Sequence, residues 1–215
     1  MRSPSSWSSI AAVLLALSTA SHSVAWADVT ASPMCASTDQ AKVIQERFKA
    51  PERNLVEALR QELRLSESAI LSALPADRAV GVPGSQFHAV WALLRTWPDA
   101  VVALRSGGHV LEVHGPIHAG EPSKVSKYFN LAPEGPGLAG HLRPDLVSAI
   151  YAVRLPGRSG DDHGVIFYDS VGEPAFGVYV PSEYARPDAV GMQRFEDTRL
   201  RMRSMPAACP GQPPG

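Results

Sequence analysis

Apolar side chains recur at helical intervals through the N-terminal third of the chain. The spacing predicts helices over residues 39–48, 54–63, 67–74 and 87–97, the third with Ser66 as its N-cap. The apolar positions that carry this pattern are Val43, Ile44, Phe48, Leu55, Leu59, Leu63, Val90, Trp91, Leu94 and Trp97. Two helices joined by a short turn also occur in DNA-reading motifs, but we favour amphipathic helices that cover a sheet.

From residue 101 to residue 180 the pattern changes to short apolar or alternating runs, which are typical of β-strands. The expected strands cover residues 101–104, 110–114, 127–131, 137–142, 149–153, 164–169 and 175–180. Gly107-Gly108 and residues 169–172 are suited to tight hairpin turns. With a last helix over residues 187–202, the chain predicts an α+β fold: N-terminal helices, an extended antiparallel β-sheet meander and a C-terminal helix.

The first 27 residues have the features of an export signal. Arg2 precedes an apolar run over residues 10–17, and Ala25-Trp26-Ala27 forms an A-x-A cleavage site. A membrane-spanning helix needs about 20 apolar residues, so no span is expected here. We therefore predict a signal peptide over 1–27, a linker over 28–38, one domain over 39–205 and a Pro/Gly-rich tail over 206–215, in a periplasmic or secreted protein.

Charge and cysteine content narrow the choice of partners. The chain has 20 basic and 21 acidic residues, which leaves no basic excess for a phosphate backbone, so nucleic acid is not an expected partner. Cys35 and Cys209 flank the predicted domain, and an oxidising compartment would allow a disulfide between them. Two free cysteines in loose tails are the alternative.

Sequence motifs of common enzymes are absent from the chain. It has no G-x-S-x-G elbow, no G-x-G-x-x-G and no P-loop, so we expect a protein that is not an enzyme. His109 and His114 are an odd number of residues apart on one strand and should point to opposite faces, and His118 follows Pro116. These three histidines are therefore not expected to share a metal.

Three motifs follow one another along the predicted strands: Leu111-Glu112-Val113, then Lys127-Tyr128-Phe129-Asn130-Leu131, then Gly140-His141-Leu142. In order and spacing they resemble the haem-utilisation carrier proteins of the HutX/ChuX type. The resemblance covers roughly residues 43–202. It implies that the protein binds haem as a ligand rather than as a catalytic cofactor, and that it forms a homodimer.

The resemblance also implies a set of haem-binding residues. His141 stands at the family's Gly-His position and is the expected iron ligand, with Tyr128 assisting by stacking or as a phenolate. Lys127 and Arg105 are expected to pair with the haem propionates. Packing alone is the competing interpretation for both Tyr128 and His141, the latter as a histidine hydrogen-bonded at a strand end.

Three positions depart from the family pattern. Arg105 occupies a position where the family commonly has a second histidine, Leu155-Pro156-Gly157 replaces a Phe-Met-Gly motif, and Pro181-Ser182-Glu183 replaces Gly-Arg-Asp. The leading hypothesis is an exported haem-binding protein that holds or transfers haem, with haem-uptake machinery as a possible partner. The alternative is a non-catalytic envelope protein that has lost haem and binds another protein. A haem-degrading enzyme is a third and weaker hypothesis.

Overall fold

A computed structural model describes residues 34–106, 108–131, 138–158, 160–181 and 189–210. The predicted signal peptide, residues 132–137, residues 182–188 and the end of the tail lie outside the described residues. Five α-helices are described: α1 (Thr38–Arg47), α2 (Leu55–Leu63), α3 (Glu67–Ser72), α4 (Phe87–Leu94) and α5 (Ala189–Arg203). The strands are β1 (Ala79–Pro83), β2 (Ala100–Ser106), β3 (His109–Gly115), β4 (Gly120–Pro122), β5 (Phe129–Leu131), β6 (Gly140–Leu142), β7 (Ala149–Pro156), β8 (Asp161–Tyr168) and β9 (Pro174–Tyr179). The α+β fold class is confirmed.

The strands form two antiparallel sheets, where one extended meander was expected. Six strands pair in the order β1-β7-β8-β9-β2-β3, and β4-β5-β6 make a separate small sheet. Strand β1 was not predicted, because it contains Gly81 and Pro83, and both residue types are depleted in strands. It lies at one edge of the larger sheet, where proline at a strand end is tolerated.

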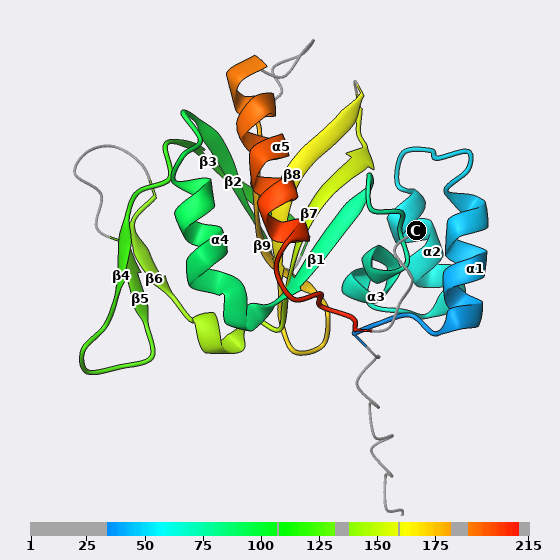
Figure 1. The fold of residues 1–215 in the computed structure, drawn as a ribbon, viewed down its shortest axis with the longest axis horizontal. Coiled ribbons are helices and arrows are strands. Elements are labelled where there is room, and N and C mark those ends of the chain that lie inside the picture. The colour runs from blue at the N-terminus through cyan, green and yellow to red at the C-terminus, as the bar shows by residue number, and fades with distance from the viewer. Residues whose placement is uncertain (1–33, 107, 132–137, 159, 182–188, 211–215) are drawn as a thin grey trace, which may run out of the picture. The chain divides into compact units, whose positions relative to one another are not determined.

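One face of the six-stranded sheet is covered by α4 and α5, which cross it in Figure 1. Aromatic rings dominate this interior: Phe87 of α4 lies 5.5 Å from Phe167 of β8 and 5.5 Å from Phe129 of β5, measured between ring centroids. Helix α4 is thus packed between the two sheets. The buried indole N–H of Trp97 donates to the hydroxyl of Thr198 on α5, over 3.0 Å.

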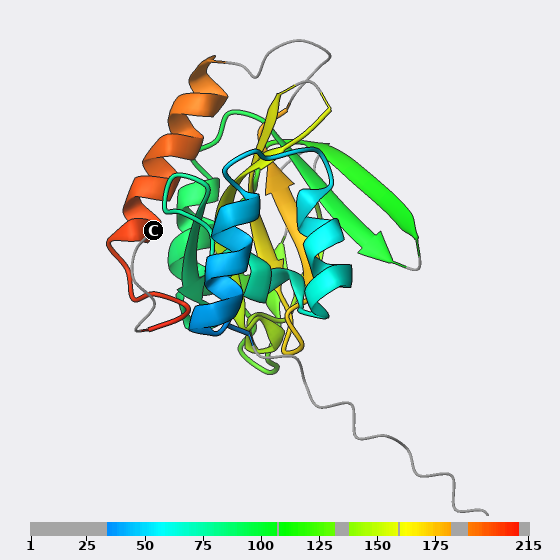
Figure 2. The same cartoon turned by 90° about the vertical axis from the view of Figure 1, so that its right-hand side faces the viewer.

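The opposite face of the six-stranded sheet is covered only in part. Helices α1, α2 and α3 pack against β1, β7 and β8, and they lie together at one side of the sheet in Figure 2. Ser66 accepts a hydrogen bond from the backbone N–H of Ala69 and caps α3, as predicted. Strands β9, β2 and β3 continue beyond these helices, so the described residues leave part of this face open.

A disulfide joins Cys35, just before α1, to Cys209, beyond α5. The predicted bridge is therefore confirmed. Next to it, the backbone N–H of Ala208 donates to the carbonyl of Gly81 on β1, over 3.0 Å. Within the described part of the chain, no helix is long and apolar enough to cross a membrane.

Candidate functional site

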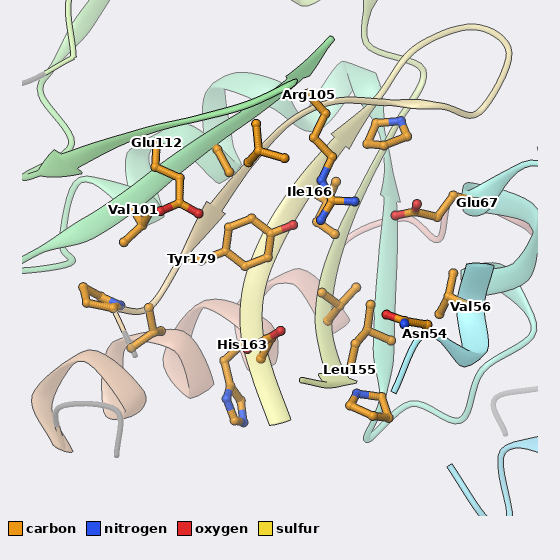
Figure 3. A pocket seen from close by; sticks show the side chains of 18 of the residues that line it. Asn54, Val56, Glu67, Val101, Arg105, Glu112, Leu155, His163, Ile166 and Tyr179 are labelled. Atoms are coloured by element: carbon orange, nitrogen blue, oxygen red, sulfur yellow. The ribbon is translucent and has the colours of Figure 1, made fainter. Parts of the chain in front are cut away.

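The uncovered part of the large sheet forms the floor of a cavity of about 750 Å³. Residues alternate between the two faces of a strand, so Ala100 and Val102 of β2 point into the core under α4 and α5, while Val101, Ala103 and Arg105 line the cavity. The first turn of α2 and Glu67 of α3 form one wall. Figure 3 shows these side chains around the open space.

Tyr179 lies flat in the middle of this floor. It sits beside Gly164 of β8 and Gly177 of β9, where a Cβ atom on either glycine would lie only 2.4 Å or 2.5 Å from its ring carbons. The two glycines therefore leave the room that the ring occupies against the backbone. As a result the Tyr179 ring turns one face toward the cavity in Figure 3.

Arg105 is the permanent cation among the described residues that line the cavity. Its side chain reaches toward the phenol of Tyr179 in Figure 3. Burial raises the pKa of Tyr179 to about 12, although the positive charge of Arg105 acts in the opposite direction. Burial also raises the pKa of Asp162, which again is opposed by His163 and Arg105. Because its pKa is raised, the Tyr179 phenol is neutral at physiological pH.

The wall formed by α2 and α3 is held by an ion network centred on Arg60. Its guanidinium lies 3.0 Å from Glu57, 3.8 Å from Glu67 and 2.6 Å from Glu173, which follows β8. The Tyr168 hydroxyl also donates to Glu67, over 2.7 Å. These contacts tie the helices to the sheet beside the cavity and fix the direction of the Glu67 carboxylate.

His163 contributes to the rim of the cavity, but its ring turns away from the open space in Figure 3. The ring meets Phe195 of α5 edge-on, with 5.2 Å between centroids. Its Nδ1 atom is buried without a hydrogen-bond partner among the described residues. Burial, followed by the charge of Arg154, lowers the pKa of His163. The sequence analysis did not identify this residue, although strand periodicity from Val165 could have placed it on the α5 face.

The predicted ligand His141 lies on β6 of the small sheet and is exposed. Its Nδ1 atom is 2.8 Å from the side-chain oxygen of Asn130 on β5, and the Tyr128 ring lies 5.6 Å from its own. The guanidinium of Arg143 lies 5.6 Å from the Tyr128 ring centroid. The structure thus brings His141 and Tyr128 together on one surface.

The cations of this surface are already paired with Asp145. Arg143 forms two hydrogen bonds with its carboxylate, of 2.7 and 2.8 Å, and the Lys127 ammonium lies 3.5 Å from it. The bond to Arg143 is the main reason that the pKa of Asp145 is lowered to about 2. Lys127 is therefore close to His141 and Tyr128, but it has a carboxylate partner of its own.

Arg105 does not belong to the His141 surface within one chain. Phe129 and Leu131 of β5 point inward against α4, so Asn130 between them faces outward. His141 is paired with Asn130 across β5 and β6 and faces outward as well. Arg105 lies on the far face of the six-stranded sheet, with that sheet and α4 between it and His141. The four residues proposed from sequence thus fall at two separate places.

The other histidines do not connect the His141 surface with the cavity that contains Arg105. His114 of β3 lines the cavity, and His109 lies in a shallower hollow beside Arg105. In the described part of the chain, no three side chains of the kind that bind metals gather at one point. By contrast, the cavity is lined by four residues from the positions that depart from the family pattern: Arg105, Leu155, Pro156 and Pro181.

Fold and cavity together define the class of protein: an α+β protein with an open hollow of ligand size on its larger sheet. The chain belongs to the haem-utilisation ChuX/HutX family, whose model matches residues 80–197. The resemblance inferred from the three motifs is therefore confirmed.

A curated relative is the intracellular heme transport protein HutX of Vibrio cholerae serotype O1. It is 27% identical over 145 residues, which are 63% of this chain and 74% of the relative. Among solved structures, ChuX superposes with a TM-score of 0.65 at 18% identity, covering 74% of this chain and 98% of its own. Protein AGR_C_4470 from Agrobacterium tumefaciens gives 0.63 at 26% identity, with 77% and 91% covered.

Family membership settles two of the expectations. Proteins of this family carry haem as a bound ligand, which confirms the expectation that the chain is not an enzyme. The expectation of a periplasmic or secreted protein is wrong, because the curated relative is an intracellular transport protein. It rested on a short apolar run preceded only by Arg2 and on the A-x-A sequence at residues 25–27, which together are a weak basis for predicting export.

Proposed function

We propose that this protein binds haem and transfers it during haem utilisation. Family membership is the observation that carries the proposal, and the cavity supports it. A hollow of about 750 Å³ falls within the range of about 300–1,000 Å³ that is usual for small-molecule pockets. We also propose that a component of the haem-uptake machinery receives the haem from this protein.

The experiment is a titration of the purified protein with ferric haem, followed by visible absorption. A saturable and sharpened Soret band is the expected result. A featureless titration that matches free haem in buffer would overturn the proposed function.

We further propose that His141 is an iron ligand, assisted by Tyr128 and Lys127. The contact between its Nδ1 atom and Asn130 supports this, because a partner at one ring nitrogen orients the imidazole and leaves Nε2 for the metal. The His141 ring is exposed, so its removal should leave the fold intact.

His141→Ala is expected to weaken ferric haem binding at least tenfold and to remove the spectrum of the ligated iron. His109→Ala removes an exposed imidazole from β3 and is the matched control. Equal Soret bands and affinities for wild type and His141→Ala would refute the ligand assignment, while the proposed function would stand.

A homodimer is also proposed, and strand β3 is the candidate contact. It lies at the edge of the six-stranded sheet, and its Val110 and Leu111 side chains are 54% and 67% exposed. An unpaired edge strand with apolar side chains is a favourable surface for strand pairing between chains. Light scattering that gives the monomer mass at micromolar concentration would contradict it.

A further inference from the structure

The disulfide between Cys35 and Cys209 lies near the surface and not in the aromatic core. Both cysteines are only half-buried, so a thiol from solution can reach their sulfur atoms. Accessible disulfides are the kind that thiol exchange opens readily. The chain contains two cysteines in all, so a thiol reductant acts on this bond alone. The bond is therefore a candidate for reversible chemistry as well as a structural crosslink.

The bridge ties the start of α1 to the far end of the chain. On one side, Ala36 donates its backbone N–H to the Ser72 hydroxyl of α3, over 2.9 Å, and Ser37 then caps α1. On the other side, Ala208 donates to the carbonyl of Gly81 on β1. Figure 1 shows the segment after α5 reaching the start of α1. The crosslink thus fixes the start of α1 to a segment that is itself bonded to the larger sheet.

Helix α1 supports the two helices that form one wall of the cavity. Ile44 and Phe48 on its inner side are buried in one cluster with Leu55 of α2. The Arg47 guanidinium also lies 2.6 Å from the Glu62 carboxylate of α2. Because the first turn of α2 lines the cavity, a displacement of α1 reaches the cavity wall through packed neighbours.

Separation of α1 from α2 and α3 is harder while the bridge is intact. A helix of ten residues depends on its packing, because it is too short to be stable alone. In the oxidised protein a detached α1 stays tied to Cys209 at its start, so it gains little conformational entropy. In the reduced protein it gains more. Reduction should therefore make local opening of the wall more frequent, while the closed structure stays the same.

The exchange itself is ordinary thiol–disulfide chemistry. A thiolate of a dithiol reductant attacks Sγ of Cys35, the bond between the two sulfurs breaks, and the electron pair leaves on Sγ of Cys209. The second thiolate of the reductant then attacks the mixed disulfide and releases Cys35. The protein gains two electrons and the two protons that the dithiol has lost, and the reductant becomes a disulfide.

Tyr151 of β7 favours Cys209 as the leaving sulfur. Its hydroxyl lies 3.8 Å from Sγ of Cys209, within reach of a hydrogen bond to sulfur. Burial raises the pKa of the Tyr151 hydroxyl, so this group stays protonated and can donate. A hydrogen bond to the departing thiolate lowers the pKa of that thiol, and a thiol of lower pKa leaves faster. The geometry thus directs the attack to Cys35.

We propose that the disulfide between Cys35 and Cys209 is a redox modification site, through which a dithiol reductant loosens the wall formed by α2 and α3 and speeds the release of the ligand from the cavity. The inference rests on the proposed function, because the ligand is haem. It goes beyond that function in assigning a reversible modification and the chemical class of the partner that performs it. The oxidised protein retains haem, and the reduced protein releases it sooner.

The test compares oxidised protein with protein that has been reduced, alkylated with iodoacetamide and separated from the reductant, since free thiolates bind haem iron themselves. Each form is loaded with ferric haem and mixed with excess apomyoglobin, which takes up haem as it is released. We expect release about five- to tenfold faster from the reduced protein. The double variant Cys35→Ser/Cys209→Ser should release haem at the rate of the reduced form, whether or not it is treated with reductant.

Two results of this assay would count against the proposal. Equal release rates from the oxidised and the reduced protein would overturn the redox control and leave the proposed function intact. If the oxidised protein bound no haem, the proposed function and the redox control would both fall.

Trypsin cleavage without haem locates the opening. Lys42 lies in the middle of α1 and can be cut only when this helix opens, whereas Lys124 lies in an exposed loop. Cleavage after Lys42 should become about tenfold faster on reduction, and cleavage after Lys124 should not change. An unchanged rate at Lys42 would overturn the proposal. So would cleavage after Arg154 of β7 at the same increased rate, because the whole fold would then be opening.

Tyr151→Phe tests the direction of attack, since it keeps the ring and removes the hydroxyl. Reduction of the disulfide by dithiothreitol should slow by about three- to tenfold in this variant. A variant that merely loosened the fold would expose the bridge and be reduced faster, so slower reduction is specific to the lost hydrogen bond. A rate equal to that of wild type would overturn the role of Tyr151.

Discussion

Breaking the disulfide between Cys35 and Cys209 should strongly destabilise the fold. The bridge spans 174 residues, and it closes nearly the whole described chain into one loop. In the loop-entropy model a crosslink of this length stabilises the folded state by about 5 kcal/mol, because it removes conformations from the unfolded chain. Contacts that persist without it, such as the hydrogen bond from Ala208 to Gly81, leave the folded structure largely unchanged. We therefore expect a loss of about 3–5 kcal/mol, against a usual total of about 5–15 kcal/mol.

Urea denaturation of the oxidised protein and of the double variant Cys35→Ser/Cys209→Ser measures this difference. The slope of the unfolding free energy against urea should rise in the double variant, because an uncrosslinked unfolded chain exposes more surface. Dithiothreitol should move the wild-type midpoint to that of the double variant and should not affect the variant itself. A loss below about 1 kcal/mol, or a midpoint that falls with an unchanged slope, would refute the entropic reasoning.

Three further changes test individual contacts. Thr198→Val keeps the shape of the side chain but leaves the buried Trp97 N–H without its acceptor, and thermal or urea unfolding should show a loss of about 1–3 kcal/mol. His163 has a lowered pKa in the folded state, so as the pH falls below 6.5 the unfolded chain takes up a proton before the folded chain does. The contribution of this residue to stability should therefore be full above pH 6.5 and decline below it. His163→Gln should flatten this decline in urea titrations between about pH 7.5 and 5. Gly177→Ala puts a methyl group 2.5 Å from the Tyr179 ring, so the free energy of unfolding measured in urea should fall by about 1–3 kcal/mol. An unchanged free energy of unfolding would contradict the close fit of the ring against this glycine.

The parts of the fold that depend on neighbours in sequence could be predicted. Ser66 caps α3 as expected, since a serine followed by a short apolar helix is a local pattern. The hairpin of β8 and β9 turns at residues 169–172, where Gly172 has a positive φ of 79° and the Asp169 carboxylate accepts the N–H of Val171. Division of the strands into two sheets was not predictable in this way, because α4 has to lie between them before β5 can bury Phe129 against it.

The candidate site could be predicted only where a motif carried it. The Gly-His motif placed His141, and the registers of β5 and β6 then set it opposite Asn130. No sequence motif identified Tyr179 as part of the site. Its position against the sheet follows from Gly164 and Gly177, which lie on neighbouring strands, and only the pairing of Gly164 with Tyr179 across β8 and β9 brings these glycines under one ring.

The separation of His141 from Arg105 also constrains how haem could be handed on. With a six-stranded sheet and α4 between them, one haem cannot meet both residues in the same chain. A carrier has to release its cargo, and release is easier from an exposed ring on the surface than from a cavity with apolar walls. His141 is exposed and has its Nδ1 atom fixed by Asn130, so it suits exchange of an iron-bound haem with a partner. The cavity is partly enclosed and has apolar side chains in its lining, so it suits retention. Haem that binds at these two places should therefore give biphasic binding, and loss of His141 should remove the faster-exchanging phase while the slower one remains.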